Sequence, residues 1–154
     1  MDKAQFLKND LVSHIAAIPA DRQPAWGKMN LQQMTEHLSR EGFGWASGRI
    51  PQWEILSPAE HLPQYQAFIM SEKPFRENTE NKLMPAEPLP LEHPGMPAAL
   101  TALQEEIDYF FHVFEREPGK TLINPFFGEL DYTLWVHLLH KHARHHLKQF
   151  GVII

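Results

Sequence analysis

The sequence predicts an all-α protein, a four-helix bundle with a long proline-rich crossover between its second and third helices. Four segments show the spacing of apolar residues that is typical of amphipathic helices, and no alternating strand pattern of useful length competes with them. Eight of the 13 prolines lie between residues 49 and 96, which indicates a long irregular connection. The chain has 154 residues, the size of one domain, so residues 1–154 are interpreted as a single unit.

The first two helices are predicted near residues 3–18 and 31–47. The apolar face of the first is formed by Leu7, Leu11, Ile15 and Ile18. This helix is expected to end before Pro19. The second helix begins with a capping-box pattern, Asn30 followed three residues later by Gln33. Its apolar face is formed by Leu31, Met34, Leu38 and Trp45.

The last two helices are predicted near residues 97–116 and 132–150. Pro97 suits the first turn of the third helix, because its missing N–H has no partner there in any case. Asp131 is the expected N-cap of the fourth helix and Gly151 its expected C-cap.

The crossover, residues 49–96, is too long for an ordinary loop of a compact domain. A capped start at Ser57 and Pro58 predicts a short helix near residues 58–70, with a break at Pro63, and the rest is expected to be extended. The crossover is interpreted as a covering segment, with a lid over a site as the alternative. The only candidates for β-strands in the sequence are two short stretches, residues 121–123 and 152–154.

Composition excludes several classes of function. The chain has no cysteine, which rules out disulfides, thiolate zinc sites, iron–sulfur clusters and a cysteine nucleophile. The formal net charge of −5 argues against a basic nucleic-acid surface. Residues 1–10 are charged where a signal peptide needs an apolar run, and no stretch of about 18 apolar residues exists. We therefore expect a cytoplasmic protein without nucleic-acid or membrane partners.

The fourth helix carries the densest group of the ten histidines. His142 and His146 are four residues apart and share one helix face, so their imidazoles can reach one metal ion. They continue the apolar face formed by Trp135, Leu138 and Leu139, which a solvated histidine run would not do. His137 and His140 point to the opposite side. The segment lacks the catalytic glutamate of a zinc-protease helix, because Ala143 occupies its place.

A third ligand should project from a facing helix, and the second helix offers His37 at the border of its apolar face. Spacing alone leaves His37 equally open to a structural role. Glu41 lies on that apolar face, where an unpaired carboxylate is costly, and is a candidate fourth ligand, supporting acceptor or base. His145 lies at the edge of the face that carries His142. The other histidines are interpreted as structural or surface residues: His14, His61, His93 and His112.

Three segments form a recognisable combination: residues 25–37, which enter and begin the second helix; residues 124–128, Asn-Pro-Phe-Phe-Gly; and residues 142–151 at the end of the fourth helix. Together they resemble the DinB-like (DinB/YfiT) superfamily, in particular a branch of proteins of unknown function. The resemblance implies a four-helix bundle with a long crossover. It also implies a divalent metal held by one histidine of the second helix and two of the fourth, which here are His37, His142 and His146. The crossover contains no motif that matches the family.

Some relatives of this kind are thiol-dependent transferases or isomerases, so the resemblance implies a possible reaction class. We expect a divalent-metal enzyme, a thiol transferase or hydrolase, that acts on a small molecule with a low-molecular-weight thiol as a possible partner. Glu41 or His145 would move the proton. Zn or Ni is the expected metal, with Fe, Mn or Cu as alternatives. Other hypotheses are a non-catalytic metal-binding module and a stress-associated helical dimer. A homodimer is expected, because four Trp and ten Phe are more than one small core needs and some aromatic surface would be shared.

Overall fold

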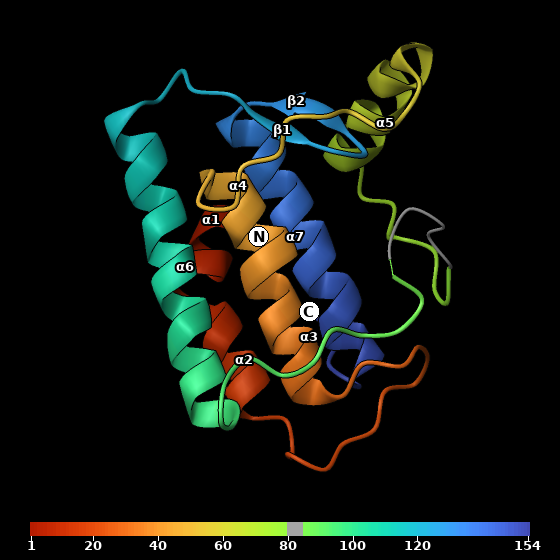
Figure 1. Cartoon of the computed structure of the whole chain (residues 1–154), viewed down its shortest axis with the longest axis vertical. Helices are drawn as coiled ribbons and strands as arrows, with labels where there is room; N and C mark the ends of the chain where they lie inside the picture. Colours follow the sequence, from red (N-terminus) through yellow and green to blue (C-terminus); the bar gives the residue numbers. More distant parts are fainter. Residues whose placement is uncertain (80–84) are drawn as a thin grey trace.

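The computed structural model describes residues 1–79 and 85–154, and helices dominate it (Figure 1). The predicted all-α class is therefore confirmed in its broad form. The described residues also contain one two-stranded antiparallel sheet, formed by β1 (Leu122–Asn124) and β2 (Gly128–Leu130). Residues 80–84 of the predicted crossover lie outside the described residues.

The first two predicted helices form as continuous helical segments, and each contains a π-helical section. The first consists of α1 (Lys3–Gln5), η1 (Phe6–Asp10) and α2 (Leu11–Ala16). It ends two residues earlier than predicted. The second consists of α3 (Leu31–His37), η2 (Leu38–Gly44) and α4 (Trp45–Ser47), and it matches the predicted bounds. The capping box is confirmed, because Asn30 accepts from the N–H of Gln33 and Gln33 accepts from the N–H of Asn30.

The two long helices also follow the prediction. They are α6 (Met96–Arg116), with Pro97 in its first turn, and α7 (Tyr132–Gln149). Asp131 caps α7 by accepting from the N–H of Leu134 at 2.9 Å, and Gly151 follows its C-terminus with a φ of +85°. The crossover contains a 3₁₀ turn, η3 (Ala59–His61), and then the short helix α5 (Leu62–Met70).

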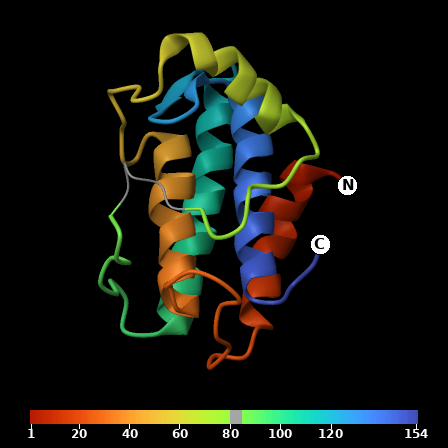
Figure 2. The same ribbon diagram turned by 90° about the vertical axis from the view of Figure 1, so that its right-hand side faces the viewer.

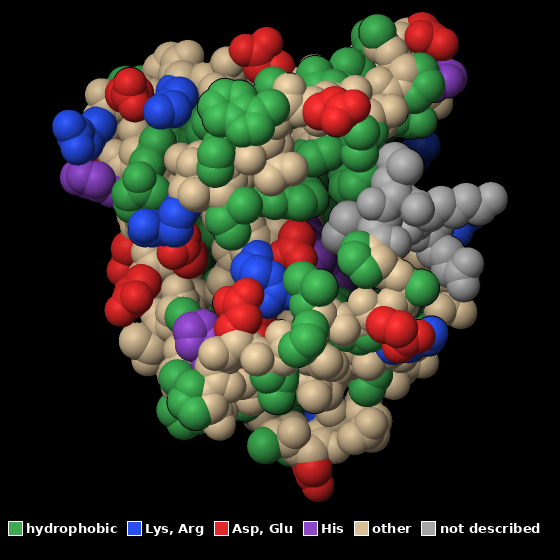
Figure 3. Space-filling model, in the orientation of Figure 1, with side chains coloured by type: hydrophobic (Ala, Val, Ile, Leu, Met, Phe, Trp, Pro, Cys, Tyr) green, Lys and Arg blue, Asp and Glu red, His purple; other side chains and the backbone are tan. Residues whose placement is uncertain are grey.

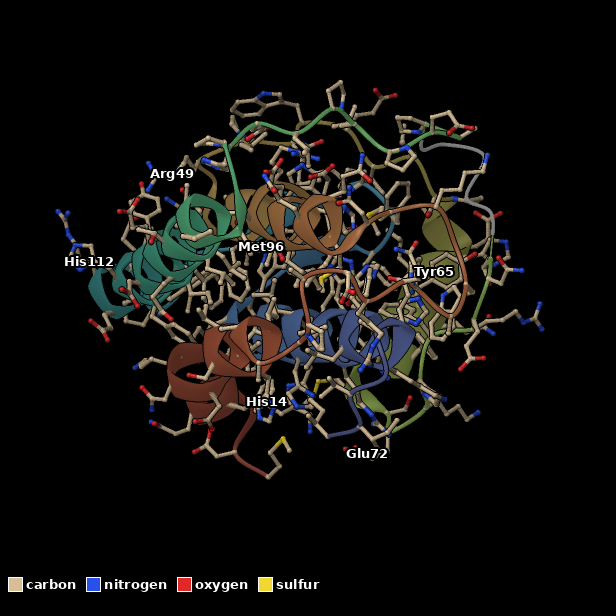
Figure 4. The ribbon with its side chains drawn as sticks, turned by 90° about the horizontal axis from the view of Figure 1, so that it is seen from below. His14, Arg49, Tyr65, Glu72, Met96 and His112 are labelled. Atoms are coloured by element: carbon tan, nitrogen blue, oxygen red, sulfur yellow. The ribbon has the colours of Figure 1, made fainter. Side chains whose placement is uncertain are left out.

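The helices pack around one apolar core, which includes every residue of the predicted face of the first helix. Seen along the helices, α3 and α6 form one layer, and α7 with the N-terminal helix forms the other (Figure 4). The side chain of His112 on α6 points away from the core in this view and is exposed. None of the described helices is long and apolar enough to cross a membrane.

The hairpin and α5 cover one end of the helices, and the connection at residues 17–30 covers the other (Figures 1 and 2). Trp135 of α7 donates from its indole N–H to the carbonyl of Leu122 at 3.3 Å and so joins α7 to the hairpin. Gln66 of α5 donates to the carbonyl of Phe127 at 3.0 Å in the hairpin turn. Residues 152–154, a candidate strand in the sequence, form no strand.

Candidate metal centre

Three histidine side chains from two helices converge on one point. Nε2 of His142 lies 2.9 Å from Nε2 of His37 and 3.0 Å from Nε2 of His146. Among the described residues, these three form a group whose ligand atoms all lie within 4.8 Å of one another. Their rings meet edge to face, so each ring directs a nitrogen toward the common centre.

This spacing fits a metal ion after a small adjustment. Two imidazole nitrogens bound to one tetrahedral metal at about 2.0–2.1 Å are about 3.3 Å apart. The observed distances of 2.9 and 3.0 Å are shorter by a few tenths of an ångström, which a small ring rotation supplies. An all-imidazole donor set suits Zn, Ni, Cu or Fe. The structure thus places all three predicted ligands together, and they could hold a metal ion.

Gln149 sets the tautomer of His146. Its amide Nε2 donates to the carbonyl of Trp26 at 2.8 Å, so its Oε1 is the atom that lies 2.9 Å from Nδ1 of His146. An amide oxygen only accepts, and Nδ1 of His146 must therefore carry the proton. The lone pair of His146 is then on Nε2, where it faces the centre, which is the arrangement that metal-binding histidines show.

Glu41 lies behind His37, at ion-pair distance rather than hydrogen-bond distance. Its Oε1 lies 3.7 Å from Nδ1 of His37, the nitrogen that faces away from the centre, and its Oε2 accepts from Nε of Arg40 at 3.2 Å. Burial raises the pKa of Glu41, but His37 and Arg40 together outweigh it and lower this pKa below its usual range. Glu41 is therefore ionised at neutral pH, and its negative charge lies beside Nδ1 of His37. Of its predicted roles, this position fits the supporting acceptor.

The two histidines of α7 are neutral at physiological pH. Burial, with the neighbouring imidazoles, lowers the pKa of His142 and of His146 well below the usual value. Neutral rings are the form that binds a metal. The sequence alone would place proton competition near pH 6.5, and the buried positions move it to lower pH.

His145 lies beside the three-histidine cluster. Its ring centroid is 5.1 Å from that of His146, and its ring also contacts Trp26 and Phe75. Burial lowers the pKa of His145. The ring is thus neutral near pH 7 and can accept a proton.

The opposite face of α7 is not a uniform solvent face. His137 is half-buried, and its Nδ1 contacts the carbonyl of Thr133 at 2.9 Å. His140 is buried, with Nε2 3.1 Å from the sulfur of Met1 and its ring against Phe6. His140 does point away from the metal centre, as predicted, but it packs against the N-terminal helix.

The three histidines line a cavity of about 410 Å³, a size in the range of small-molecule pockets. The cavity follows α7 from Trp135 to Gln149, and aromatic side chains form much of its wall: Trp26, Trp45, Phe75, Phe126, Phe127 and Trp135. The face shown in Figure 3 has a recessed histidine beside acidic and basic side chains. The cluster therefore opens onto a space that a small molecule can enter.

Several residues that shape this site were not assigned a role from the sequence. Asn124 accepts at Oδ1 from the N–H groups of Phe126 and Phe127, at 2.8 and 3.1 Å, and so holds the turn whose two phenylalanines line the cavity. Gly27 has a φ of +79°, and a Cβ there would lie 2.8 Å from Nε2 of Gln149. An asparagine before Pro-Phe-Phe-Gly and a glycine after Trp26 are turn signals, but neither indicates what the turn contacts.

Glu36 is a further residue to which the sequence analysis assigned no role. Its carboxylate is buried and accepts from the N–H groups of Glu92 and His93 and from Gln32. Burial raises the pKa of Glu36, but these hydrogen bonds outweigh it and lower this pKa. The residue ties the end of the crossover to α3, at the position directly before His37.

No protein-family model, curated protein or solved structure matches this chain.

Proposed function

We propose that this protein is a DinB-like four-helix bundle whose His37, His142 and His146 bind one divalent metal ion, and that it is a metal-dependent thiol transferase or hydrolase. The four helices would be residues 3–16, residues 31–47, α6 and α7, with α5 as an addition within the crossover. One observation carries the proposal: three Nε2 atoms from two helices converge on the wall of an open cavity that is partly lined by aromatic side chains.

The donor set favours a catalytic centre over a closed structural one. Structural zinc sites have four protein ligands, whereas three ligands leave a position for substrate or water. A bound divalent metal would act as a Lewis acid and lower the pKa of water or of a substrate thiol. His145, neutral beside the cluster, can take the released proton on a ring nitrogen. Glu41 places a carboxylate behind His37, on the side away from the cluster.

The substrate in this proposal is a small molecule, with a low-molecular-weight thiol as the second reactant of a transferase. Zn or Ni is the proposed metal, with Fe, Mn or Cu as alternatives. We further propose a cytoplasmic location and a homodimer. The described residues leave apolar side chains exposed at the start of the crossover, and Trp53 among them is 83% exposed. Light scattering at micromolar concentration tests the dimer, which a monomer would contradict.

The metal centre is tested with untagged protein purified without metal-affinity resin. Elemental analysis should find about one equivalent of a divalent metal per chain, and His142→Ala should lose it. Turnover of a small thiol with an electrophile, or of an activated ester with water, should be lost in the same variant. Bound metal without turnover of either kind would favour the alternative, a non-catalytic metal-binding module.

A further inference from the structure

The cavity contains a hydrogen-bond donor that the protein leaves unused. Asn124 is only 5% exposed, and both N–H groups that its Oδ1 accepts belong to the backbone of the hairpin turn. These two hydrogen bonds settle which end of the amide is oxygen, so the other end is the NH₂ group. Among the described residues, no group accepts a hydrogen bond from this Nδ2.

Two observations indicate that this free NH₂ group reaches the cavity. No buried side-chain nitrogen or oxygen of the described residues lacks a hydrogen-bond partner, so the unpaired Nδ2 is not sealed within protein. The space that Asn124 lines is the cavity of the three histidines. A buried amide donor without a partner is costly unless water or a ligand supplies an acceptor.

The surroundings of this donor define the rest of a ligand. Phe126 and Trp45 contact each other with ring centroids 6.2 Å apart, and both line the cavity with Asn124. Such walls accept an apolar, ring-sized body. Trp135 is the residue of α7 that bonds to Leu122 of the hairpin, and His142 lies seven residues further along the same helix. At a rise of about 1.5 Å per residue, these two positions are about 10 Å apart along the helix axis, which is close to the length of an aromatic ring with a short chain.

We propose that the cavity binds an apolar, ring-sized molecule that carries a carbonyl oxygen, with Asn124 Nδ2 donating to this oxygen. The inference rests on the proposed function only where it places the other end of the ligand at His37, His142 and His146. Asn124 thereby acts as a specificity-determining residue, because it selects molecules with an acceptor over hydrocarbons of the same shape.

The test compares phenylacetone with isobutylbenzene, which has the same skeleton but a CH–CH₃ group where the ketone has its C=O. Binding to the untagged, metal-loaded protein is followed by ¹⁵N–¹H NMR. We expect the affinity for phenylacetone relative to isobutylbenzene to be about tenfold higher in the wild-type protein than in a variant without this donor, and the side-chain NH₂ signals of Asn124 to shift with phenylacetone alone.

The matched variant is Asn124→Asp. Aspartate keeps the Oδ1 acceptor of the turn and replaces the free donor by a second oxygen, so the fold should persist. We expect this variant to lose the preference for phenylacetone and to bind isobutylbenzene as before. Asn9→Asp, at an exposed asparagine of the N-terminal helix, adds the same charge and should change neither affinity.

Three results would overturn the inference. The first is a ratio of the two affinities that is the same in the wild-type protein and in Asn124→Asp, and the second is no binding of phenylacetone at millimolar concentration. The third is an unchanged Asn124 NH₂ signal with phenylacetone bound, which needs no variant and so is independent of folding. Metal content is measured on the same samples. Loss of metal in His142→Ala with phenylacetone binding retained supports the inference, whereas absence of metal from the wild-type protein refutes the proposed function alone.

Discussion

Replacing Gln149 by Met removes both hydrogen bonds of a buried amide while keeping a side chain of similar length. Gln149 is 3% exposed, accepts at Oε1 from Nδ1 of His146, and donates to the carbonyl of Trp26. The first bond fixes the tautomer of a proposed metal ligand, and the second holds the loop that forms one end of the cavity. The two functions can therefore be measured separately.

The expected magnitudes follow from these contacts. Loss of the partner of a metal-binding histidine weakens metal affinity about 10- to 100-fold, which corresponds to about 1.4–2.7 kcal/mol. In the metal-free protein, a buried ring N–H and a carbonyl without partners should lower the free energy of unfolding by about 1–3 kcal/mol. Saturating metal should stabilise the wild-type protein more than the variant, because binding to the folded state adds to stability.

Metal affinity is measured by competition with a chromophoric chelator, and stability by urea unfolding with and without metal. Gln149→Glu separates the two bonds, since glutamate keeps the acceptor for His146 and loses the donor to Trp26. We expect it to retain metal affinity. Gln104→Met is the control, because Gln104 also makes two side-chain hydrogen bonds but lies on α6. A metal affinity of Gln149→Met within threefold of wild type would refute the reasoning.

Three further predictions concern the remaining polar groups. His142→Ala should reduce bound metal from about one equivalent to near zero after dialysis, and His137→Ala should leave it unchanged; equal losses by elemental analysis would make the assigned helix face wrong. Burial, with Lys3 and Arg144, lowers the pKa of His140 to about 4 in the folded protein, below its unfolded value of about 6.5. Protons therefore favour the unfolded state as pH falls from about 6.5 to about 4, and His140 should lower the free energy of unfolding by up to about 3 kcal/mol over this range. The His140→Leu variant should show a smaller decrease with falling pH when unfolding by urea is measured. Glu36→Gln should lower the free energy of unfolding at pH 7 by about 1–3 kcal/mol, because two backbone N–H groups would face a neutral amide; a change under about 0.5 kcal/mol would contradict this.

The helices were predictable because their signals are local. Apolar spacing, the capping box at Asn30 and the cap at Asp131 act within one or two turns, and the structure confirms them. The π-helical sections were not predicted, since a spacing of about 3.6 residues was assumed throughout. The bounds nevertheless agree closely, because Gly48 ends the second helix in the left-handed conformation with a φ of +81°.

The residues of the candidate site also differ in how far local sequence predicts them. His142 and His146 could be paired from one helix, because positions four apart share a face. His37 required the register between two helices, which spacing alone does not give; the family resemblance supplied that expectation. The burial of His140 was missed because a single helix cannot show which of its sides its neighbours cover. The N-terminal helix, α5, β2 and η2 all contact α7, so even its back face is partly enclosed.

What the sequence could not show is how the connections are held, and the structure gives one physical answer. Asn124 binds two N–H groups of the hairpin turn, Gln149 binds the carbonyl of Trp26, and Glu36 binds two N–H groups at the end of the crossover. Lys141 of α7, also buried, donates to the carbonyls of Ser71 and Lys73. Each is a buried polar side chain that satisfies backbone groups a loop cannot pair by itself.

The imidazole cluster and the walls of the cavity are held in place by different kinds of contact. The imidazole nitrogens are positioned by two helices whose packing is apolar, whereas the cavity walls at the hairpin turn and at Trp26 depend on single polar side chains, Asn124 and Gln149. A substitution at one of these tethers alters the shape of the cavity while it leaves the helices, and with them the positions of the imidazoles, unchanged. Ligand preference and metal binding are therefore separable in this fold. Gln149 is the exception, because its one amide group contacts both the Trp26 wall and His146, so a substitution that removes both hydrogen bonds should affect both properties at once.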